Sequence, residues 1–82
     1  MAKKKTVKIV ERKLGREKAY GQCFGDGLIE LDPRMNSKQY LNVSIHELLH
    51  HIFTEMSETQ VNKTASITSE ELWNLGYRRI YK

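Results

Sequence analysis

The chain has 82 residues, a length that suits one small domain with a single core, which a bound metal ion often supplements. Hydrophobic residues make up 39% of the chain and charged residues 29%, a composition that excludes a largely disordered protein, and no apolar run approaches the roughly 20 residues that cross a bilayer. The net charge of +4 permits weak contact with nucleic acid, but no base-reading motif accompanies it, so a solvated basic surface is the preferred interpretation. No apolar stretch follows the N-terminal lysines, and we therefore expect no secretory signal and a cytoplasmic protein.

Three short segments in the first half of the chain are predicted to be strands. Residues 6–11 alternate β-branched and polar side chains, and residues 18–24 are a weaker candidate in which Gly21 marks a bulge or bend. An Asp-Gly turn precedes residues 28–31, which Pro33 terminates. We expect a small antiparallel three-stranded sheet. The single cysteine, Cys23, cannot form an internal disulfide and is expected to be a small buried strand residue.

Two helices are predicted to follow the sheet, which gives an α+β fold in one domain spanning residues 1–82. The first covers residues 37–57, is capped by Asn36 or Ser37, and carries an apolar stripe at helical spacing. Residues 58–66 are polar without periodicity and are predicted to be a loop. The second helix is expected to start near Thr68, where Thr68 and Glu71 form a capping box, and to include Gly76 at a close approach of the two helices.

The most informative stretch is His46-Glu47-Leu48-Leu49-His50, an H-E-x-x-H pattern inside the first predicted helix. Residues four apart lie on one face of a helix, so His46 and His50 can offer two imidazole nitrogens to one metal ion. Glu47, one position further round, can accept a proton from a water molecule beside that ion. This combination is typical of zinc metalloproteases. The alternative is that these are ordinary polar residues of an amphipathic helix.

A catalytic zinc site needs a third protein ligand. His51 points about 100° away from the face of the two histidines, and Glu55 and Glu58, on or just after the same helix, are not expected to reach around the ion. Two glutamates remain at the start of the second predicted helix. Because Glu71 is assigned to the capping box, we favour Glu70 as the ligand, with Glu71 as the alternative.

The order of these features resembles the gluzincin branch of zinc metallopeptidases, the thermolysin-like group, in a much reduced form. The features are a strand, an Asp-Pro pair, a helix with the H-E-x-x-H motif, a loop, and a helix that carries a ligand glutamate. The chain is similar to the very short HExxH proteins found in phage genomes. The resemblance spans residues 28–80 and implies a minimal zincin-like core, one Zn²⁺ ion and peptide hydrolysis. In thermolysin-like enzymes an aspartate follows the ligand glutamate by four residues. Asn74 stands at that position here, so the resemblance does not carry over a charged contact to the first histidine.

We therefore expect zinc-dependent peptide-bond hydrolysis, in which Zn²⁺ and Glu47 activate a water molecule. Tyr77 is the preferred candidate for steadying the oxyanion and Tyr20 the second, although tyrosines at such positions are more often core residues. We expect a peptide or protein substrate to dock on the sheet edge formed by residues 28–31. The alternative function is a catalytically inactive, zinc-stabilised binding or inhibitory module.

Overall fold

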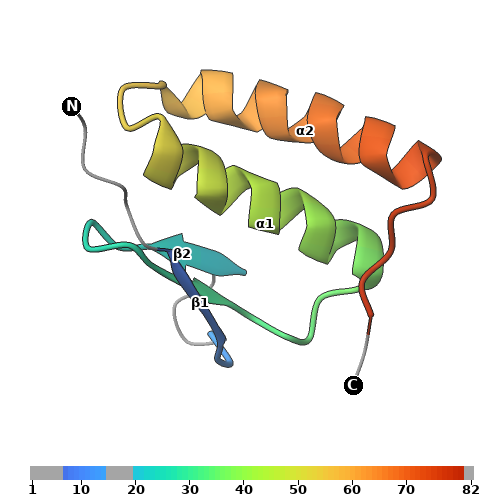
Figure 1. Ribbon diagram of the computed structural model, residues 1–82, viewed down its shortest axis with the longest axis horizontal. Coiled ribbons are helices and arrows are strands. Elements are labelled where there is room, and N and C mark those ends of the chain that lie inside the picture. Colours follow the sequence, from blue (N-terminus) through green and yellow to red (C-terminus); the bar gives the residue numbers. More distant parts are fainter. Residues whose placement is uncertain (1–6, 15–19, 81–82) are drawn as a thin grey trace.

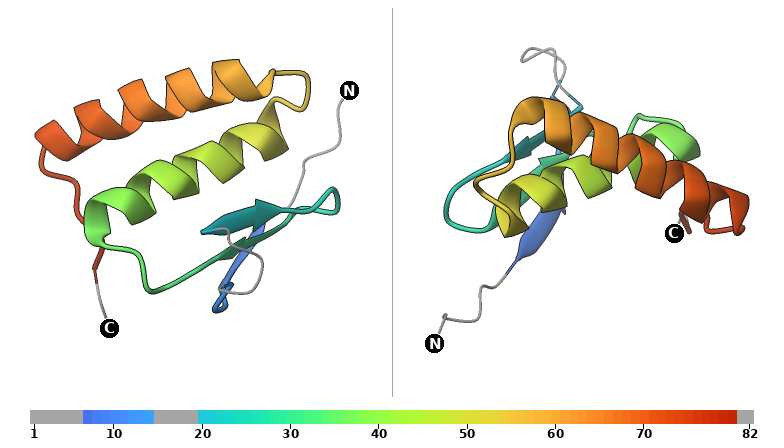
Figure 2. Two further views of the ribbon diagram at one scale, coloured as in Figure 1. Left: turned by 180° about the vertical axis from the view of Figure 1, so that it is seen from behind. Right: turned by 90° about the horizontal axis from the view of Figure 1, so that it is seen from above.

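The computed structural model describes residues 7–14 and 20–80, which form three layers (Figure 1). The elements, in chain order, are β1 (Lys8–Glu11), β2 (Gly21–Cys23), β3 (Leu28–Leu31), α1 (Ser37–Ile52) and α2 (Glu58–Asn74). The strands form one sheet, α1 lies on that sheet, and α2 packs on the other side of α1 (Figure 2). The predicted α+β architecture, a three-stranded sheet followed by two helices, is confirmed. Parts of two predicted strands, residue 6 and residues 18–19, lie outside the described residues.

The sheet is mixed, and its strand order is β1-β3-β2. β1 runs parallel to β3, and β2 runs antiparallel to it. The prediction of a fully antiparallel sheet with residues 28–31 at its edge is therefore wrong. β3 is the most apolar strand, with Ile29 and Leu31 almost completely buried, and the central position lets it bury those side chains while β1 and β2 pair with it on either side.

The β2–β3 hairpin turns where the Asp-Gly pattern predicts. The Phe24 amide donates to the Leu28 carbonyl at 2.8 Å, and the Asp26 carboxylate accepts from the Leu28 amide at 3.2 Å. Gly27 has a φ of 95°, a left-handed conformation that glycine adopts without steric cost. This hairpin sets the antiparallel register in which Cys23 faces Ile29.

Gly21 marks a close approach between β2 and α1. A Cβ atom built on Gly21 would lie 2.7 Å from Val43 Cγ1 and 3.1 Å from Glu47 Cγ. The sequence predicts a bulge or bend here, whereas the structure uses the missing side chain to bring the strand against the helix. Glycine therefore keeps β2 beside the H-E-x-x-H motif.

We predict that Gly21→Ala destabilises the protein by about 1–3 kcal/mol, because the added methyl group overpacks this contact. Gly25→Ala is the matched control, since a Cβ there meets no atom within 4 Å. Chemical denaturation of both variants tests the expectation. Equal stability of the two alanine variants would show that β2 and α1 are not this close.

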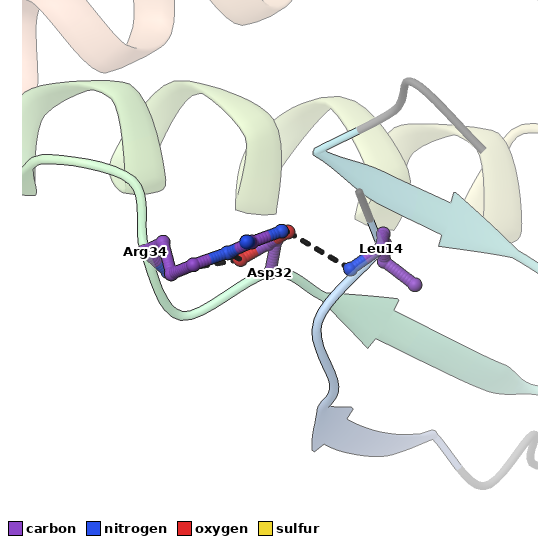
Figure 3. Close-up of polar contacts among 3 residues, drawn as sticks. All are labelled: Leu14, Asp32 and Arg34. Carbon is purple, nitrogen blue, oxygen red and sulfur yellow. Dashed lines mark hydrogen bonds and ion pairs between the residues drawn. The ribbon is translucent and has the colours of Figure 1, made fainter. Parts of the chain in front are cut away.

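Asp32, directly after β3, connects that strand to Leu14, which follows β1, and to Arg34, in the turn before α1 (Figure 3). Its carboxylate is 1% exposed and accepts from the Leu14 amide at 2.9 Å and from Arg34 Nη2 and Nε at 2.7 and 2.9 Å. These hydrogen bonds, with those from the Arg34 side chain as the largest cause, hold the pKa of Asp32 well below its usual range. The ionised form therefore stabilises the fold.

A depressed pKa gives stability that is present above the unfolded-state value of about 4 and is lost as the pH falls below it. We predict that Asp32→Asn lowers the melting temperature at pH 7 and weakens the loss of stability between about pH 5 and 2. Thermal unfolding across this pH range tests both expectations. A variant with the wild-type pH dependence would contradict this role for the carboxylate.

The helices start at strong caps, but only the first cap is predicted correctly. The Asn36 side chain accepts from the Gln39 amide at 2.8 Å and caps α1 as expected. The chain then turns over residues 53–57, and a reciprocal capping box between Ser57 and Gln60 starts α2. The predicted loop at residues 58–66 is therefore helix.

The predicted cap at Thr68 and Glu71 lies inside α2 and is wrong, because the helix has already run for ten residues. Gly76 follows the helix with a φ of 101° and has no atom within 4 Å of an added Cβ, so it ends the helix rather than marking a close approach. Beyond it, residues 77–80 are not helical, and Tyr77 and Ile80 are exposed.

Candidate metal centre

His46 and His50 lie one turn apart near the C-terminal end of α1. Their Nε2 atoms are 3.2 Å apart and their ring planes meet at 63°. The side chains are 18% and 30% exposed, so both rings are partly shielded while remaining open to solvent. The helix thus presents two imidazole nitrogens to the same small volume.

Glu58 brings a carboxylate to the two histidines from the first residue of α2. Its Oε1 lies 2.9 Å from His50 Nε2, and its Oε2 lies 3.2 Å from His46 Nε2. The turn over residues 53–57 reverses the chain, so that the start of α2 faces the end of α1. The Glu58 side chain is 63% exposed, so it is the most solvent-accessible of the three.

The three side chains fit a single small cation. Their ligand atoms all lie within 4.8 Å of one another, and the closest separations are 2.9–3.2 Å. Tetrahedral zinc with bonds of about 2.0–2.1 Å requires neighbouring ligand atoms to be roughly 3.3 Å apart. His46, His50 and Glu58 therefore form a possible metal site with two nitrogen ligands and one oxygen ligand, a donor set that zinc accepts.

Glu47 lies beside this group on the sheet-facing side of α1 and is 9% exposed. Burial raises the pKa of its carboxyl, and the neighbouring Glu58 raises it further, whereas His46 and His50 lower it. The carboxyl is therefore a better proton acceptor than a solvated glutamate, a property that suits a general base. Glu47 also lines a cavity of about 340 Å³ that His50 borders.

The other ligand candidates lie elsewhere. The Glu70 carboxylate forms an ion pair with Lys38 at 3.3 Å, near the opposite end of α1. It lies twelve positions after Glu58 on the same helix, or about 18 Å along the axis, so the structure does not bring it to the two histidines. Glu71, the alternative, follows Glu70 and is likewise remote. Because α2 begins ten residues earlier than predicted, Glu58 and not Glu70 completes the possible metal site with the two histidines.

Tyr77 does not reach the centre either. It follows the end of α2, is 60% exposed, and borders a cavity with Ser37 at the start of α1. Ser37 and His46 are nine positions apart on α1, which corresponds to about 14 Å. The second oxyanion candidate, Tyr20, is 53% exposed and precedes β2. The structure therefore does not place Tyr77 beside Glu47.

Cys23 is half-buried in β2 rather than fully buried. Burial raises the pKa of its thiol, and the negative charge of Glu47 raises it further, so the protonated form is favoured. The thiol donates weakly to the Phe24 carbonyl at 3.9 Å. Among the described residues, Cys23 does not belong to the cluster of potential metal ligands.

Comparisons of the chain with protein-family models, with curated proteins and with solved structures gave no match. Within residues 7–14 and 20–80, neither helix is both long enough and apolar enough to span a membrane.

One sequence signal does point to Glu58. Ser57-x-x-Gln60 is a capping-box pattern, and it places a helix start immediately before Glu58. The helix dipole favours a carboxylate in the first turn of a helix. Glu58 therefore stabilises the start of α2 in addition to lying where a metal ligand could lie. The later Thr68 pattern competes with this signal in the sequence.

We predict that Glu58→Gln weakens Zn²⁺ binding by at least about 100-fold, since even the loss of an outer partner of a ligand typically costs 10–100-fold. Glu70→Gln is the matched control and should leave the affinity unchanged, because Glu70 pairs with Lys38 instead. Competition titration with a chromophoric chelator measures both. A larger loss in the Glu70 variant would restore the original ligand assignment.

Proposed function

We propose that the protein is a minimal zinc metallopeptidase that hydrolyses peptide bonds. The observation that carries this proposal is the buried Glu47 carboxylate beside His46, His50 and Glu58, three side chains whose ligand atoms fit one cation. Bound Zn²⁺ would supply Lewis acidity, polarising the scissile carbonyl and lowering the pKa of water towards ~7. This proposal also keeps the resemblance to gluzincins, with Glu58 in the place of the ligand glutamate.

Glu47 has the position and the chemistry of the general base. A carboxylate with a pKa raised by burial accepts a proton from the attacking water molecule and can return that proton to the leaving nitrogen. Its place next to both histidines, and not on the solvated face of α1, keeps it within reach of any water held at the centre. Proton transfer by such a group typically contributes 10²–10⁴-fold to a rate.

The substrate is proposed to be an extended peptide that docks along β2. In the strand order, β2 is an outer strand that pairs only with β3 among the described strands. Backbone hydrogen bonds from such an edge hold a peptide without requiring a particular sequence. Gly21 presses β2 against the helix at Val43 and Glu47, so a peptide on this edge runs past the catalytic side chains.

A zinc-stabilised binding module is the second candidate, and the small core favours it. Only six hydrophobic residues among those described are fully buried: Leu14, Ile29, Leu31, Met35, Val61 and Ala65. A metal ion that joins α1 to α2 would supply folding free energy to such a domain. A structural site has no use for a buried carboxylate beside the ligands, however, and burying one carries a desolvation cost. Glu47 therefore favours catalysis.

We predict that Glu47→Gln retains zinc and the fold but loses peptide hydrolysis by about 10²–10⁴-fold, because the amide cannot accept the proton. Glu71→Gln, on the exposed face of α2, is the control and should cleave as the wild type does. Cleavage of a mixed peptide library by the zinc-loaded proteins is followed by mass spectrometry, with metal content measured in each sample. Equal cleavage by the Glu47 variant would refute the catalytic role, and binding of zinc without cleavage by any protein would favour the binding module.

A further inference from the structure

A cavity opens between the β2–β3 turn and the C-terminal half of α1, on the sheet side of the metal centre. It has a volume of about 340 Å³, and its walls are formed by Cys23, Phe24, Gly25, Glu47, His50, His51 and Thr54. Glu47 and His50 belong to the proposed catalytic centre, whereas the remaining wall residues have no role in the proposed chemistry. The cavity therefore adjoins the reacting groups and extends beyond them.

His51 is the unexplained wall residue. It is 6% exposed, and its Nε2 is buried without a hydrogen-bond partner among the residues that the structure describes. A buried polar atom left unpaired costs stability, and nearly all such atoms in folded proteins have a partner. An apolar residue of similar size would avoid this cost. The chain thus keeps an imidazole at a position where folding alone favours a hydrocarbon.

We propose that this cavity receives a side chain of the peptide substrate that carries an uncharged hydrogen-bonding group, and that His51 recognises that group. This inference rests on the proposed peptidase function and adds its side-chain preference. Rotation about the Cβ–Cγ bond of a histidine exchanges its ring nitrogens with ring carbons, so the ring can present a nitrogen on either edge. The pairing then occurs only when substrate is bound.

The charges around the cavity exclude ionised side chains. An acidic substrate side chain would enter beside the buried Glu47 carboxylate, and the two like charges would repel. A lysine or arginine would pair with Glu47 and occupy the group that must accept the proton. Neutral amides and hydroxyls avoid both conflicts and still satisfy an imidazole nitrogen.

The apolar part of the cavity wall determines which length of substrate side chain fits. The Phe24 ring is 41% exposed at the turn, and Gly25 contributes no side chain, so one end of the cavity stays open. The stem of a glutamine can lie against the Phe24 ring while its amide reaches His51. Glutamine is therefore the side chain we expect to fit best, ahead of leucine, which has similar bulk but no polar group.

The test combines stability with binding. His51→Leu should unfold at the same temperature as the wild type or higher, because it removes an unpaired polar atom and keeps the volume. Peptide binding is measured with the zinc-loaded Glu47→Gln protein, which should not cleave its ligands. The probes are decapeptides in which glutamine or leucine is placed at each position in turn. We expect one position at which the glutamine peptide binds about tenfold more tightly than the leucine peptide.

Adding His51→Leu should abolish or invert that preference, and adding His51→Gln, which keeps a hydrogen-bonding group, should retain part of it. Glu71→Gln, on the exposed face of α2 and outside the cavity, is the control and should leave the preference in place. A clear loss of stability in His51→Leu would show that Nε2 has a partner in the free protein and would overturn the inference. Peptide binding with no preference for glutamine, or with a preference that survives His51→Leu, would overturn it while leaving the proposed hydrolysis intact. Zinc-loaded protein that binds and cleaves no peptide would refute both.

Discussion

The packing of α2 on α1 is the interaction on which the candidate centre depends. The residues of α2 that it buries are Val61, Ala65 and Ser69, one in every four positions, and all are small. Small side chains let the two helix backbones approach, and the Asn42 amide reinforces the contact by donating to Ser69 Oγ at 3.0 Å. The contact through Val61, Ala65 and Ser69 determines where α2 begins relative to α1. It thereby places Glu58 opposite His46 and His50.

The centre also bears on the stability of a domain of this size. A core of six buried hydrophobic residues among those described provides limited hydrophobic stabilisation. Two buried groups lower this stability: the Glu47 carboxylate of the motif, and a His51 nitrogen without a partner in the described part of the chain. Functional sites commonly keep such locally unfavourable groups, and other interactions offset their cost. The Asp32 network at the end of β3 is one such interaction, and a cation held by His46, His50 and Glu58 would be another.

The sequence was sufficient for the features that depend on local chemistry. Helical periodicity and the cap at Asn36 located the start of α1, although the helix ends at Ile52 and not at residue 57 as predicted. The Asp-Gly turn located the β2–β3 hairpin. The i, i+4 spacing correctly placed the two histidines on one face. These predictions succeed because each depends on residues within a few positions of one another.

The features that failed depend on long-range packing. The first half of α2 turns polar side chains outward and buries only Val61 and Ala65, so its apolar periodicity is too faint to separate it from a loop. That error moved the expected ligand from Glu58 to Glu70. The parallel pairing of β1 with β3 could not be derived either. Strand order depends on which strand is the most apolar and becomes central in the folded domain, and the alternation of side chains within each strand does not encode that order.

Zinc K-edge X-ray absorption spectroscopy of the zinc-loaded protein tests the central claim most directly, because it reads the ligands without relying on activity. The proposed function predicts one Zn²⁺ surrounded only by nitrogen and oxygen atoms at about 2.0–2.2 Å, with outer-shell scattering from two imidazole rings. Glu58→Gln should alter the first shell, and Glu70→Gln should leave the spectrum unchanged. A sulfur ligand at about 2.3 Å, which would have to come from Cys23 or a second chain, or the absence of imidazole scattering would contradict a centre built from His46, His50 and Glu58.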